Sequence, residues 1–340
     1  MMSFNKALAL LVEGQNLDSG MMREAMHSIM SGDATDAQIG AFLVALRIKG
    51  ETIDEITGAV QVMRELSTGV EVFGNYIVDI VGTGGDESNL FNVSTAATFV
   101  VAAAGARVAK HGNRSVSSKS GAADFLEVAG VNLNLNRYQV AQCVENIGVG
   151  FMFAPSHHSA MRHAIGPRKE IGLRTIFNIL GPMTNPAGVK RQLVGVYDKA
   201  LCRPMAEVLG RLGAEHIMVV NSADGLDEIS TAAETFVAEF KDGSIKEYEV
   251  LPENYLGKRQ SIEGLAVGNA ESSLEVVMAA FDGNAEQAAD LICLNAGAAL
   301  YVSGFTSNID EGVNLAQQMI LSGAAKAKLE ELVILSNSLI

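Results

Sequence analysis

Hydrophobic residues recur at helical spacing throughout the first seventy residues of the chain. Two capping boxes begin at Thr35 and Thr52, because each threonine is followed three residues later by Gln or Glu. Gly32 and Gly50 stand where a left-handed residue commonly ends a helix. The apolar positions with helical spacing are Ile39, Phe42, Leu43, Leu46, Ile56, Val60 and Met63. The pattern predicts a small bundle of three or four helices.

The pattern changes near residue 67, and short runs rich in valine and isoleucine then alternate with helical stretches. The expected strands cover residues 76–82, 105–109, 149–153, 192–197 and 216–220. The helical stretches between them cover residues 94–104, 121–129, 136–148 and 199–213. Such alternation is typical of a parallel sheet that is covered on both faces. Residues 235–250 alternate about Asp242-Gly243 and predict an antiparallel hairpin, and the chain is predicted to be helical from Ser272 onward.

These patterns predict an α/β protein with a small all-helical N-terminal domain and a larger α/β domain with a mostly parallel central sheet covered by helices. A chain of 340 residues agrees with about two domains. We expect the helical domain to cover residues 1–70 and the α/β domain to cover residues 74–340.

The composition restricts the classes of partner. The formal charge is −14, from 39 acidic and 25 basic residues, so the chain repels nucleic acid and anionic membranes, and we expect neither as a partner. No apolar run approaches the roughly 20 residues that span a bilayer. The three cysteines lie far apart without a CxxC pair and are expected to be reduced thiols in the core. We expect a soluble, cytoplasmic protein.

The first candidate site is the turn Gly82-Thr-Gly-Gly-Asp86, which follows a predicted strand and precedes a predicted helix. It is not a dinucleotide fingerprint, because the third glycine is out of register. It is not a P-loop either, because no lysine follows the glycines before Lys110. Two interpretations remain open: an anion site made of backbone amides at a helix N-terminus, or an ordinary turn with a helix cap.

The neighbouring sequence favours the anion site. Residues 88–123 contain no aspartate or glutamate, although the whole chain is acidic. The same stretch carries four cations and a histidine: Arg107, Lys110, Arg114, Lys119 and His111. A solvated basic face is the alternative, but residues 110–121 form a loop rich in hydroxyls, glycine and cations. This composition predicts a cradle for a phosphorylated small ligand.

A second basic cluster covers residues 155–186 and includes Arg162, Arg168, Lys169 and Arg174. Its histidines His157, His158 and His163 lack the spacing of a metal site, and we expect them to pack or to form hydrogen bonds. Arg168 follows Gly166-Pro167, and we expect it near the start of a helix, where its charge would oppose the helix dipole. Its planar fork at that place favours a role in binding a carboxylate.

Asp227 and Glu228 are adjacent in a loop that follows the predicted strand at residues 216–220. Loops after parallel strands gather at one edge of the sheet, where ligands bind. Two neighbouring carboxylates suit Mg²⁺, which takes few protein oxygens and completes its shell with substrate phosphates. A solvated acidic loop is the alternative interpretation.

Together these motifs resemble those of the anthranilate phosphoribosyltransferases, a branch of the nucleoside-phosphorylase-like phosphoribosyltransferases. The resemblance covers essentially the whole chain. The motifs occupy residues 81–86, 91–95, 110–124, 168–187 and 225–230. It implies transfer of the phosphoribosyl group of 5-phosphoribosyl 1-pyrophosphate (PRPP) to the amine of anthranilate, in tryptophan biosynthesis. It also implies a homodimer formed through the helical domain, which part of residues 155–186 would join.

The resemblance also implies roles for individual residues. The residues that would bind PRPP are Gly82, Gly85, Asp86, Asn92, Ser94, Thr95, Lys110, Asn113, Ser118 and Ala122. Asn113 and Arg168, with Gly82 close by, would position anthranilate. Ser94, Asp227 and Glu228 would bind Mg²⁺. The sequence shows no nucleophile with a paired base, so Lys110 and Arg168 are expected to act through electrostatics and positioning.

One position departs from the family pattern, because Leu90 stands where the family usually has threonine. A lost hydroxyl would weaken substrate binding by roughly 0.5–1.5 kcal/mol, unless the backbone amide serves instead. Two other functions stay open at this point. A pyrimidine nucleoside phosphorylase would share the fold, and a non-enzymatic relative would bind nucleic acid; the net charge and the completeness of the motifs disfavour the second.

Overall fold

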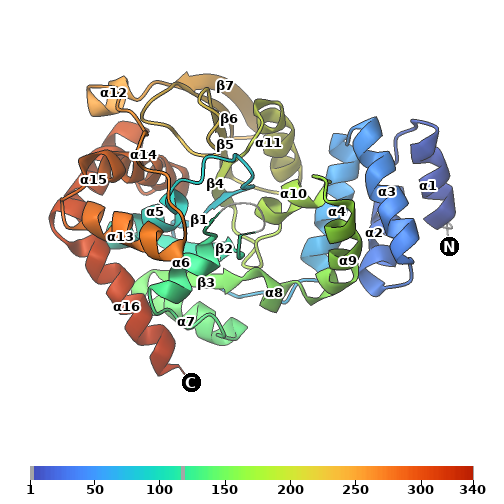
Figure 1. Cartoon of the computed structure of the whole chain (residues 1–340), viewed down its shortest axis with the longest axis horizontal. Helices are drawn as coiled ribbons and strands as arrows, with labels where there is room; N and C mark the ends of the chain where they lie inside the picture. The colour runs from blue at the N-terminus through green and yellow to red at the C-terminus, as the bar shows by residue number, and fades with distance from the viewer. Residues whose placement is uncertain (1–3, 116–118, 340) are drawn as a thin grey trace.

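The computed structural model describes residues 4–115 and 119–339. A bundle of four helices at the N-terminus lies beside a larger part built around a sheet (Figure 1). The helices of the bundle are α1 (Phe4–Val12), α2 (Ser19–Ser31), α3 (Asp36–Lys49) and α4 (Ile53–Glu65). The predicted helical N-terminal region is therefore confirmed.

The bundle begins and ends its helices where the sequence pattern places them. The side chain of Thr35 accepts a hydrogen bond from the amide of Gln38, and the side chain of Gln38 accepts one from the amide of Thr35. Thr52 and Glu55 make the same reciprocal pair at the start of α4. Gly32 ends α2 with φ of 82°, a conformation that favours glycine.

Seven strands form one sheet in the order β3-β2-β1-β4-β5-β6-β7. Their bounds are β1 (Ile77–Gly82), β2 (Arg107–Gly112), β3 (Val149–Phe153), β4 (Arg191–Gly195), β5 (His216–Ser222), β6 (Thr235–Lys241) and β7 (Ser244–Val250). The first five strands are parallel, and β6 and β7 are antiparallel. The predicted hairpin is confirmed, with φ above 50° at both Asp242 and Gly243.

The strand order reverses between β1 and β4. From β1 the chain runs outward to β2 and β3, and it then returns to the other side of β1 to form β4. Loops on either side of such a reversal point diverge above the sheet, and ligands bind in the crevice between them. The topology therefore places the candidate site at the carboxyl ends of β1 and β4.

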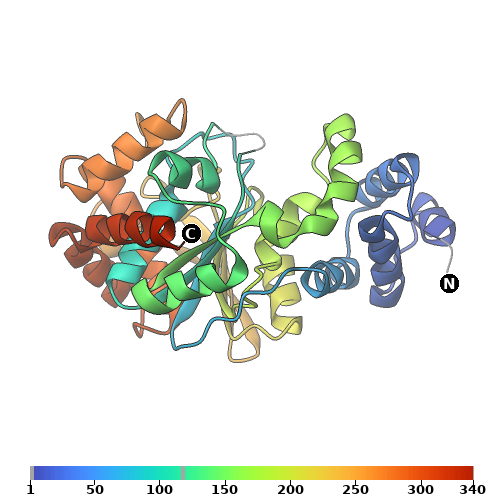
Figure 2. The same ribbon diagram turned by 90° about the horizontal axis from the view of Figure 1, so that it is seen from below.

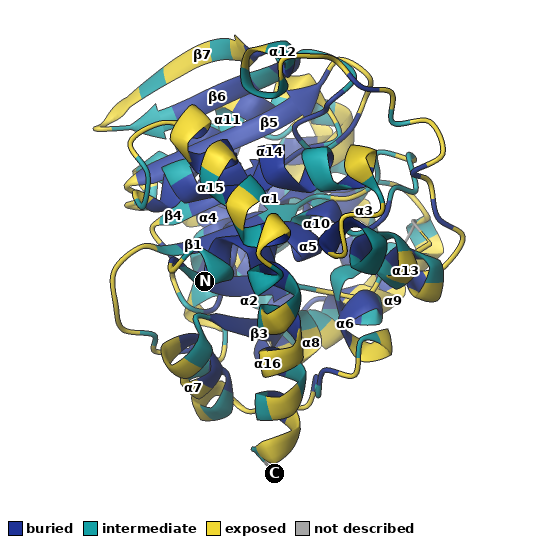
Figure 3. Ribbon diagram, turned by 90° about the vertical axis from the view of Figure 1, so that its left-hand side faces the viewer, coloured by how far each residue is buried: buried dark blue, intermediate teal, exposed yellow. Residues whose placement is uncertain are grey.

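Helices cover both faces of the sheet. The helices of the α/β part are α5 (Val93–Ala103), α6 (Ala122–Val128), α7 (Arg137–Ile147), α11 (Cys202–Arg211), α12 (Glu253–Leu256), α13 (Ala270–Phe281), α14 (Glu286–Ser303), α15 (Ile309–Leu321) and α16 (Ala324–Ser338). Along β5, Met218 and Val220 belong to the core beneath α5 and α14, whereas Ile217 and Val219 belong to the core that continues into the helical bundle. Figure 3 shows the inner strands buried, with exposed residues on β7 and α16.

Three chain segments connect the two parts. One leads from α4 to β1, one carries α8 (Ala154–His157), and one leads from α10 (Phe177–Leu180) to β4 (Figure 2). The amide of Thr68 donates to the carbonyl of His157 at 2.8 Å, and the amide of Val70 donates to the carbonyl of Pro186 at 3.0 Å. The connecting segments are thus tied to one another by main-chain bonds.

One local expectation is wrong. Gly166-Pro167 does not break a helix, because both residues lie inside α9 (Arg162–Ile171), which packs against α2 and α3 and ends at Gly172 with φ of 64°. Arg168 therefore lies in the last turn of α9, where its charge complements the helix dipole. The proline removes only one hydrogen bond of the helix, and the tertiary contacts of α9 offset that loss.

No helix in residues 4–115 or 119–339 is both long enough and apolar enough to cross a membrane.

The crossing of α14 and α15 generates a prediction about stability. A methyl group at Gly312 would lie 2.2 Å from the carbonyl oxygen of Gly297, so Gly312→Ala must push the two helices apart. We expect the free energy of unfolding to fall by about 2 kcal/mol. Gly40→Ala is the matched control, because no atom lies within 4 Å of its added methyl group and alanine favours α3 by about 0.5–1 kcal/mol. Equal urea midpoints for the two variants would contradict the prediction.

Candidate active site

The carboxyl ends of β1 and β4 carry two paired glycines, Gly82 and Gly195. A methyl group at Gly82 would lie 2.5 Å from the carboxylate of Asp227, and one at Gly195 would lie 1.6 Å from the carbonyl oxygen of Asp227. The loop that carries Asp227 therefore lies directly on the ends of these strands. Larger residues at either glycine would exclude it.

The glycine turn bonds to this loop. The amide of Gly84 donates to Asp227 Oδ2 at 2.8 Å, and the amide of Thr83 donates to the carbonyl of Gly195 at 2.9 Å. Gly84 and Gly85 have φ of 63° and 81°, which explains why the turn requires two successive glycines. The turn and the acidic pair, 141 residues apart between Asp86 and Asp227, thus belong to one site.

Three carboxyl groups, those of Asp86, Asp227 and Glu228, interact electrostatically beside the glycine turn. Burial raises the pKa of Asp227 to about 7, and the nearby charge of Asp86 contributes to this shift. Burial, and then Asp227, also raises the pKa of Glu228 well above its usual range. Glu228 Oε1 accepts a hydrogen bond from the amide of Ser94 at 3.1 Å, at the N-terminus of α5. Both residues are half-buried, so the interpretation as a freely solvated loop is wrong.

Lys110 supplies positive charge beneath these acids. Its side chain is buried, and Nζ donates to the carbonyl of Ile80 at 2.5 Å and to Ser94 Oγ at 3.4 Å. Burial lowers the pKa of Lys110, while the charges of Asp79 and Glu228 raise it. The charges of Asp79 in the sheet and of Glu228 in the site therefore both act on the ammonium group.

Sequence reasoning missed Asp79. It is fully buried in β1, where Oδ2 accepts from Asn185 Nδ2 at 2.7 Å and Oδ1 accepts from the amide of His111 at 3.2 Å. Burial raises the pKa of Asp79 to about 6, although Lys110 opposes this shift. The signal in the sequence was a single carboxylate within an otherwise apolar strand, a residue type that is rarely buried without a partner.

Asn92 and Thr95 lie at the start of α5 but differ in their surroundings. Asn92 Oδ1 accepts from Ser120 Oγ at 2.7 Å and from Ser273 Oγ at 2.8 Å, so Asn92 ties three segments together. Thr95 is buried, and its hydroxyl has no hydrogen-bond partner within the described residues.

The cationic stretch separates into different places. Arg107 lies at the start of β2, at the opposite edge of the sheet, and its guanidinium donates to the carbonyl of Phe73 at 2.6 Å. Arg114 forms ion pairs with Glu127 at 2.6 Å and Asp124 at 3.0 Å, which anchor the loop to α6. Lys110, in contrast, is bonded to Ser94, whose amide donates to Glu228, so it lies next to the acidic pair.

Two further predicted residues, Asn113 and Ala122, flank this loop. The carbonyl of Asn113 accepts from the amide of Ala123 at 3.2 Å, and Ala122 opens α6. Ser118 lies outside the described residues. Leu90 packs on the core of the α/β part, and its amide donates to Ser88 Oγ at 3.3 Å. That amide is therefore already occupied.

Arg168 and the histidines lie on the side of the connecting segments. The guanidinium of Arg168 stacks over Phe177, 5.1 Å from the ring centroid, and burial lowers its pKa. The rings of His111 and His158 meet edge to face at 5.1 Å, and both are buried. His157 Nδ1 contacts the carbonyl of Thr68 at 2.8 Å, which agrees with its expected hydrogen-bonding role.

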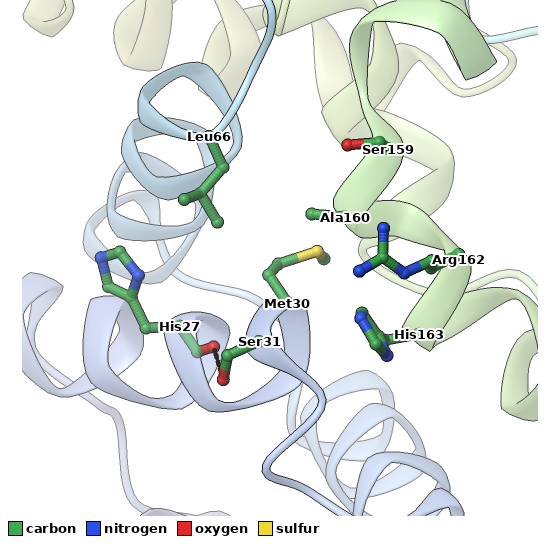
Figure 4. Close-up of a pocket in the computed structure, with 8 residues that line it drawn as sticks. All are labelled: His27, Met30, Ser31, Leu66, Ser159, Ala160, Arg162 and His163. Atoms are coloured by element: carbon green, nitrogen blue, oxygen red, sulfur yellow. Dashed lines mark hydrogen bonds between the residues drawn. The ribbon is translucent and has the colours of Figure 1, made fainter.

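A cavity of about 290 Å³ lies elsewhere, between α2 and α9 (Figure 4). It is lined by His27, Met30, Ser31, Leu66, Ser159, Ala160, Arg162 and His163. None of these residues belongs to the glycine turn or to the acidic pair, so this cavity is separate from the candidate active site.

The protein therefore has an α/β fold with its candidate site where the strand order reverses. The site contains the glycine turn, the buried Lys110 and the acidic pair Asp227-Glu228. The model of the glycosyl transferase family a/b domain matches residues 74–326, and that of the helical bundle domain of the same family matches residues 5–67.

Relatives support the same assignment. The chain is 61% identical to the anthranilate phosphoribosyltransferase of Saccharophagus degradans over 98% of both chains. It is 62% identical to that of Marinobacter nauticus, over 97% of this chain and 98% of the relative. The chain belongs to the anthranilate phosphoribosyltransferase family.

Solved structures of this family have the same fold. The crystal structure of the enzyme from Thermus thermophilus has a TM-score of 0.91 and 38% identity, covering 97% of this chain and 99% of that one. The Saccharomyces cerevisiae enzyme in complex with PRPP and Mg has a TM-score of 0.89 and 27% identity, covering 99% and 98%.

The buried histidines generate a prediction about pH. Burial lowers the pKa of His158 to about 4, whereas an unfolded histidine titrates near 6.5. Between pH 7 and 5 the unfolded chain therefore binds a proton that the folded chain excludes, and the free energy of unfolding falls by about 2 kcal/mol through this residue.

Urea unfolding at the two pH values tests this expectation. His158→Gln removes the titrating group. Between pH 7 and 5 the free energy of unfolding of this variant should therefore fall by about 2 kcal/mol less than that of the wild type. Gly40→Ala is the control, because it changes no titrating group and its added methyl group lies in open space, so the loss should equal that of the wild type. Equal losses in His158→Gln and the wild type would contradict the prediction.

Proposed function

We propose that this chain transfers the 5-phosphoribosyl group of PRPP to the amine of anthranilate, releasing pyrophosphate. The observation that carries this function is the identity of about 60%, over nearly the whole chain, to enzymes named for it. The contacts among the glycine turn, Lys110 and the acidic pair support it, because PRPP is a doubly phosphorylated sugar that requires amides, cations and acids in one place.

We further propose that the site takes Mg²⁺. Asp227 and Glu228 are adjacent, and burial raises the pKa values of both; the neighbouring negative charges, including that of Asp86, raise them further. Asp227 and Glu228 are consecutive in one loop, which the amide of Gly84 joins to the glycine turn. That arrangement suits Mg²⁺, which takes one or two carboxylates together with substrate phosphates.

In this proposal Ser94, Asp227 and Glu228 hold the ion. When bound, Mg²⁺ would supply positive charge to the departing pyrophosphate. The structure of the Saccharomyces cerevisiae enzyme contains PRPP and Mg. Because the present chain is related to that enzyme, this complex supports the proposal.

The residues of the chain would act mainly by orientation and electrostatics. Amides of the glycine turn and the N-terminus of α5 favour the negative charge that develops on the leaving group. The positive charge of Lys110 interacts with the charges of Asp79 and Glu228, and its ammonium group donates a hydrogen bond to Ser94 Oγ. The other residues proposed to bind PRPP are Gly82, Gly85, Asp86, Asn92, Thr95, Asn113, Ser118 and Ala122.

Arg168 is proposed to hold the carboxylate of anthranilate. Its guanidinium is half-buried and stacked on Phe177, and within the described residues it forms no ion pair. A desolvated guanidinium without an anionic partner is costly, so a substrate carboxylate would relieve that cost. Together with Asn113 and Gly82, Arg168 would orient anthranilate so that its amine faces the ribose of PRPP.

The helical part is proposed to form a homodimer. We assign to it residues 1–70 together with part of residues 155–186, and we assign residues 74–340 to the phosphoribosyl-binding part. The bundle and the segment after α9 expose large apolar side chains, with exposed fractions of 82% for Ile48, 72% for Val12 and 54% for Leu173. A second copy would cover this surface.

The proposed function predicts a fluorescence decrease as anthranilate is consumed, only when PRPP and Mg²⁺ are both present. Asp227→Asn together with Glu228→Gln removes both carboxylates, so we expect turnover to fall below detection. Arg203→Ala, which removes an exposed ion pair on α11, is the control and should keep wild-type activity. Phosphorolysis of thymidine in place of this reaction would identify a nucleoside phosphorylase, and wild-type turnover by the double variant would exclude the metal assignment.

Arg168→Ala should raise the KM for anthranilate at least tenfold, because the variant loses a charged hydrogen bond to the carboxylate. The KM for PRPP should change less than twofold. Steady-state kinetics with each substrate varied in turn separate the two effects. An unchanged KM for anthranilate would remove Arg168 from this role.

A further inference from the structure

The segment between α9 and α10 reaches the glycine turn through one side chain. The guanidinium of Arg174 donates a hydrogen bond to the carbonyl of Gly85 and lies 3.5 Å from the carboxylate of Glu87. It also stacks over the ring of Tyr197, 4.3 Å from the centroid, just beyond β4. The same residue thus contacts the turn and the strand beside it.

The main chain of Arg174 belongs to the helical side. Arg47 of α3 donates to its carbonyl at 2.5 Å. Ile176, two residues further on, is buried in the core that the helical bundle shares with one face of the sheet. Arg174 therefore links the helical bundle directly to the turn that follows β1.

The bond to Gly85 fixes the orientation of one peptide group. In a trans peptide the carbonyl and the following amide point in opposite directions. The carbonyl of Gly85 faces Arg174, so the amide of Asp86 points away from it. Within the described residues, the amides of Gly85 and Asp86 make no hydrogen bond. Arg174 thereby holds the unpaired amide of Asp86 in one orientation.

We propose that Arg174 is a positioning residue that fixes the glycine turn for binding the diphosphate of the substrate and couples it to the helical bundle. This inference rests on the proposed function. The role requires a planar guanidinium, because one group must stack on Tyr197 and donate to Gly85 together. Lysine would keep the charge but lose the stacked, fixed fork.

Steady-state kinetics of Arg174→Ala and Arg174→Lys test the proposal. We expect the KM for PRPP to rise at least tenfold in the alanine variant and at least fivefold in the lysine variant. The KM for anthranilate should stay within twofold of the wild type, and the melting temperature within about 2 °C. Tyr197→Leu should raise the KM for PRPP at least threefold, whereas Tyr197→Phe keeps the stacking ring and the wild-type value.

Arg203→Ala provides the matched control, because it removes an exposed arginine that pairs with Glu247 at 2.6 Å, and it should change neither KM. Wild-type KM values in Arg174→Lys would reduce the role to charge alone and overturn the proposal. Equal rises in both KM values would indicate general damage and overturn it as well.

A separate measurement distinguishes failure of this inference from failure of the proposed function. If the wild type lacks transferase activity, the proposed function is wrong. Calorimetry with inorganic pyrophosphate and Mg²⁺ then still compares wild type and Arg174→Ala. At least tenfold weaker binding by the variant supports the positioning role, and equal affinity overturns it.

Discussion

The close approach of the Asp227 loop to the ends of β1 and β4 is the constraint on which the site depends. Gly82 and Gly195 are paired in the sheet, and the absence of side chains at both positions leaves room for this loop. The loop then accepts the amide of Gly84, which fixes the turn beside the acids. Two glycines thus bring together segments that are far apart along the chain.

Once the loop lies there, its charges must be balanced. Glu228 accepts a hydrogen bond from the amide of Ser94 at the start of α5, and the charge of Lys110 acts on both Glu228 and Asp79. Burial, and then the charge of Asp86, still raise the pKa of Asp227, so the site does not fully stabilise its ionised form. A site with excess buried negative charge and adjacent free amides suits a cation and a phosphorylated ligand together.

Much of the fold could be predicted from local sequence signals. Capping boxes at Thr35 and Thr52 and the left-handed glycine at residue 32 mark helix ends, because caps depend on residues three or four positions apart. Runs of valine and isoleucine identify the parallel strands, and Asp242-Gly243 identifies the hairpin. Adjacent acids at positions 227 and 228 could also be recognised as a candidate site without knowledge of their neighbours.

The sequence by itself determined the local elements and the set of polar residues available to a site; only the tertiary structure decided which of them meet. Arg107 and Lys110 lie in one strand, but Arg107 faces the edge of the sheet away from the site and Lys110 contacts Ser94 within it. The helix that contains Pro167 continues because α2 and α3 support it. Asp79 is recognisable in the sequence as a carboxylate within an apolar strand, but its partners and those of Arg174 come from distant segments, and only the tertiary structure identifies them.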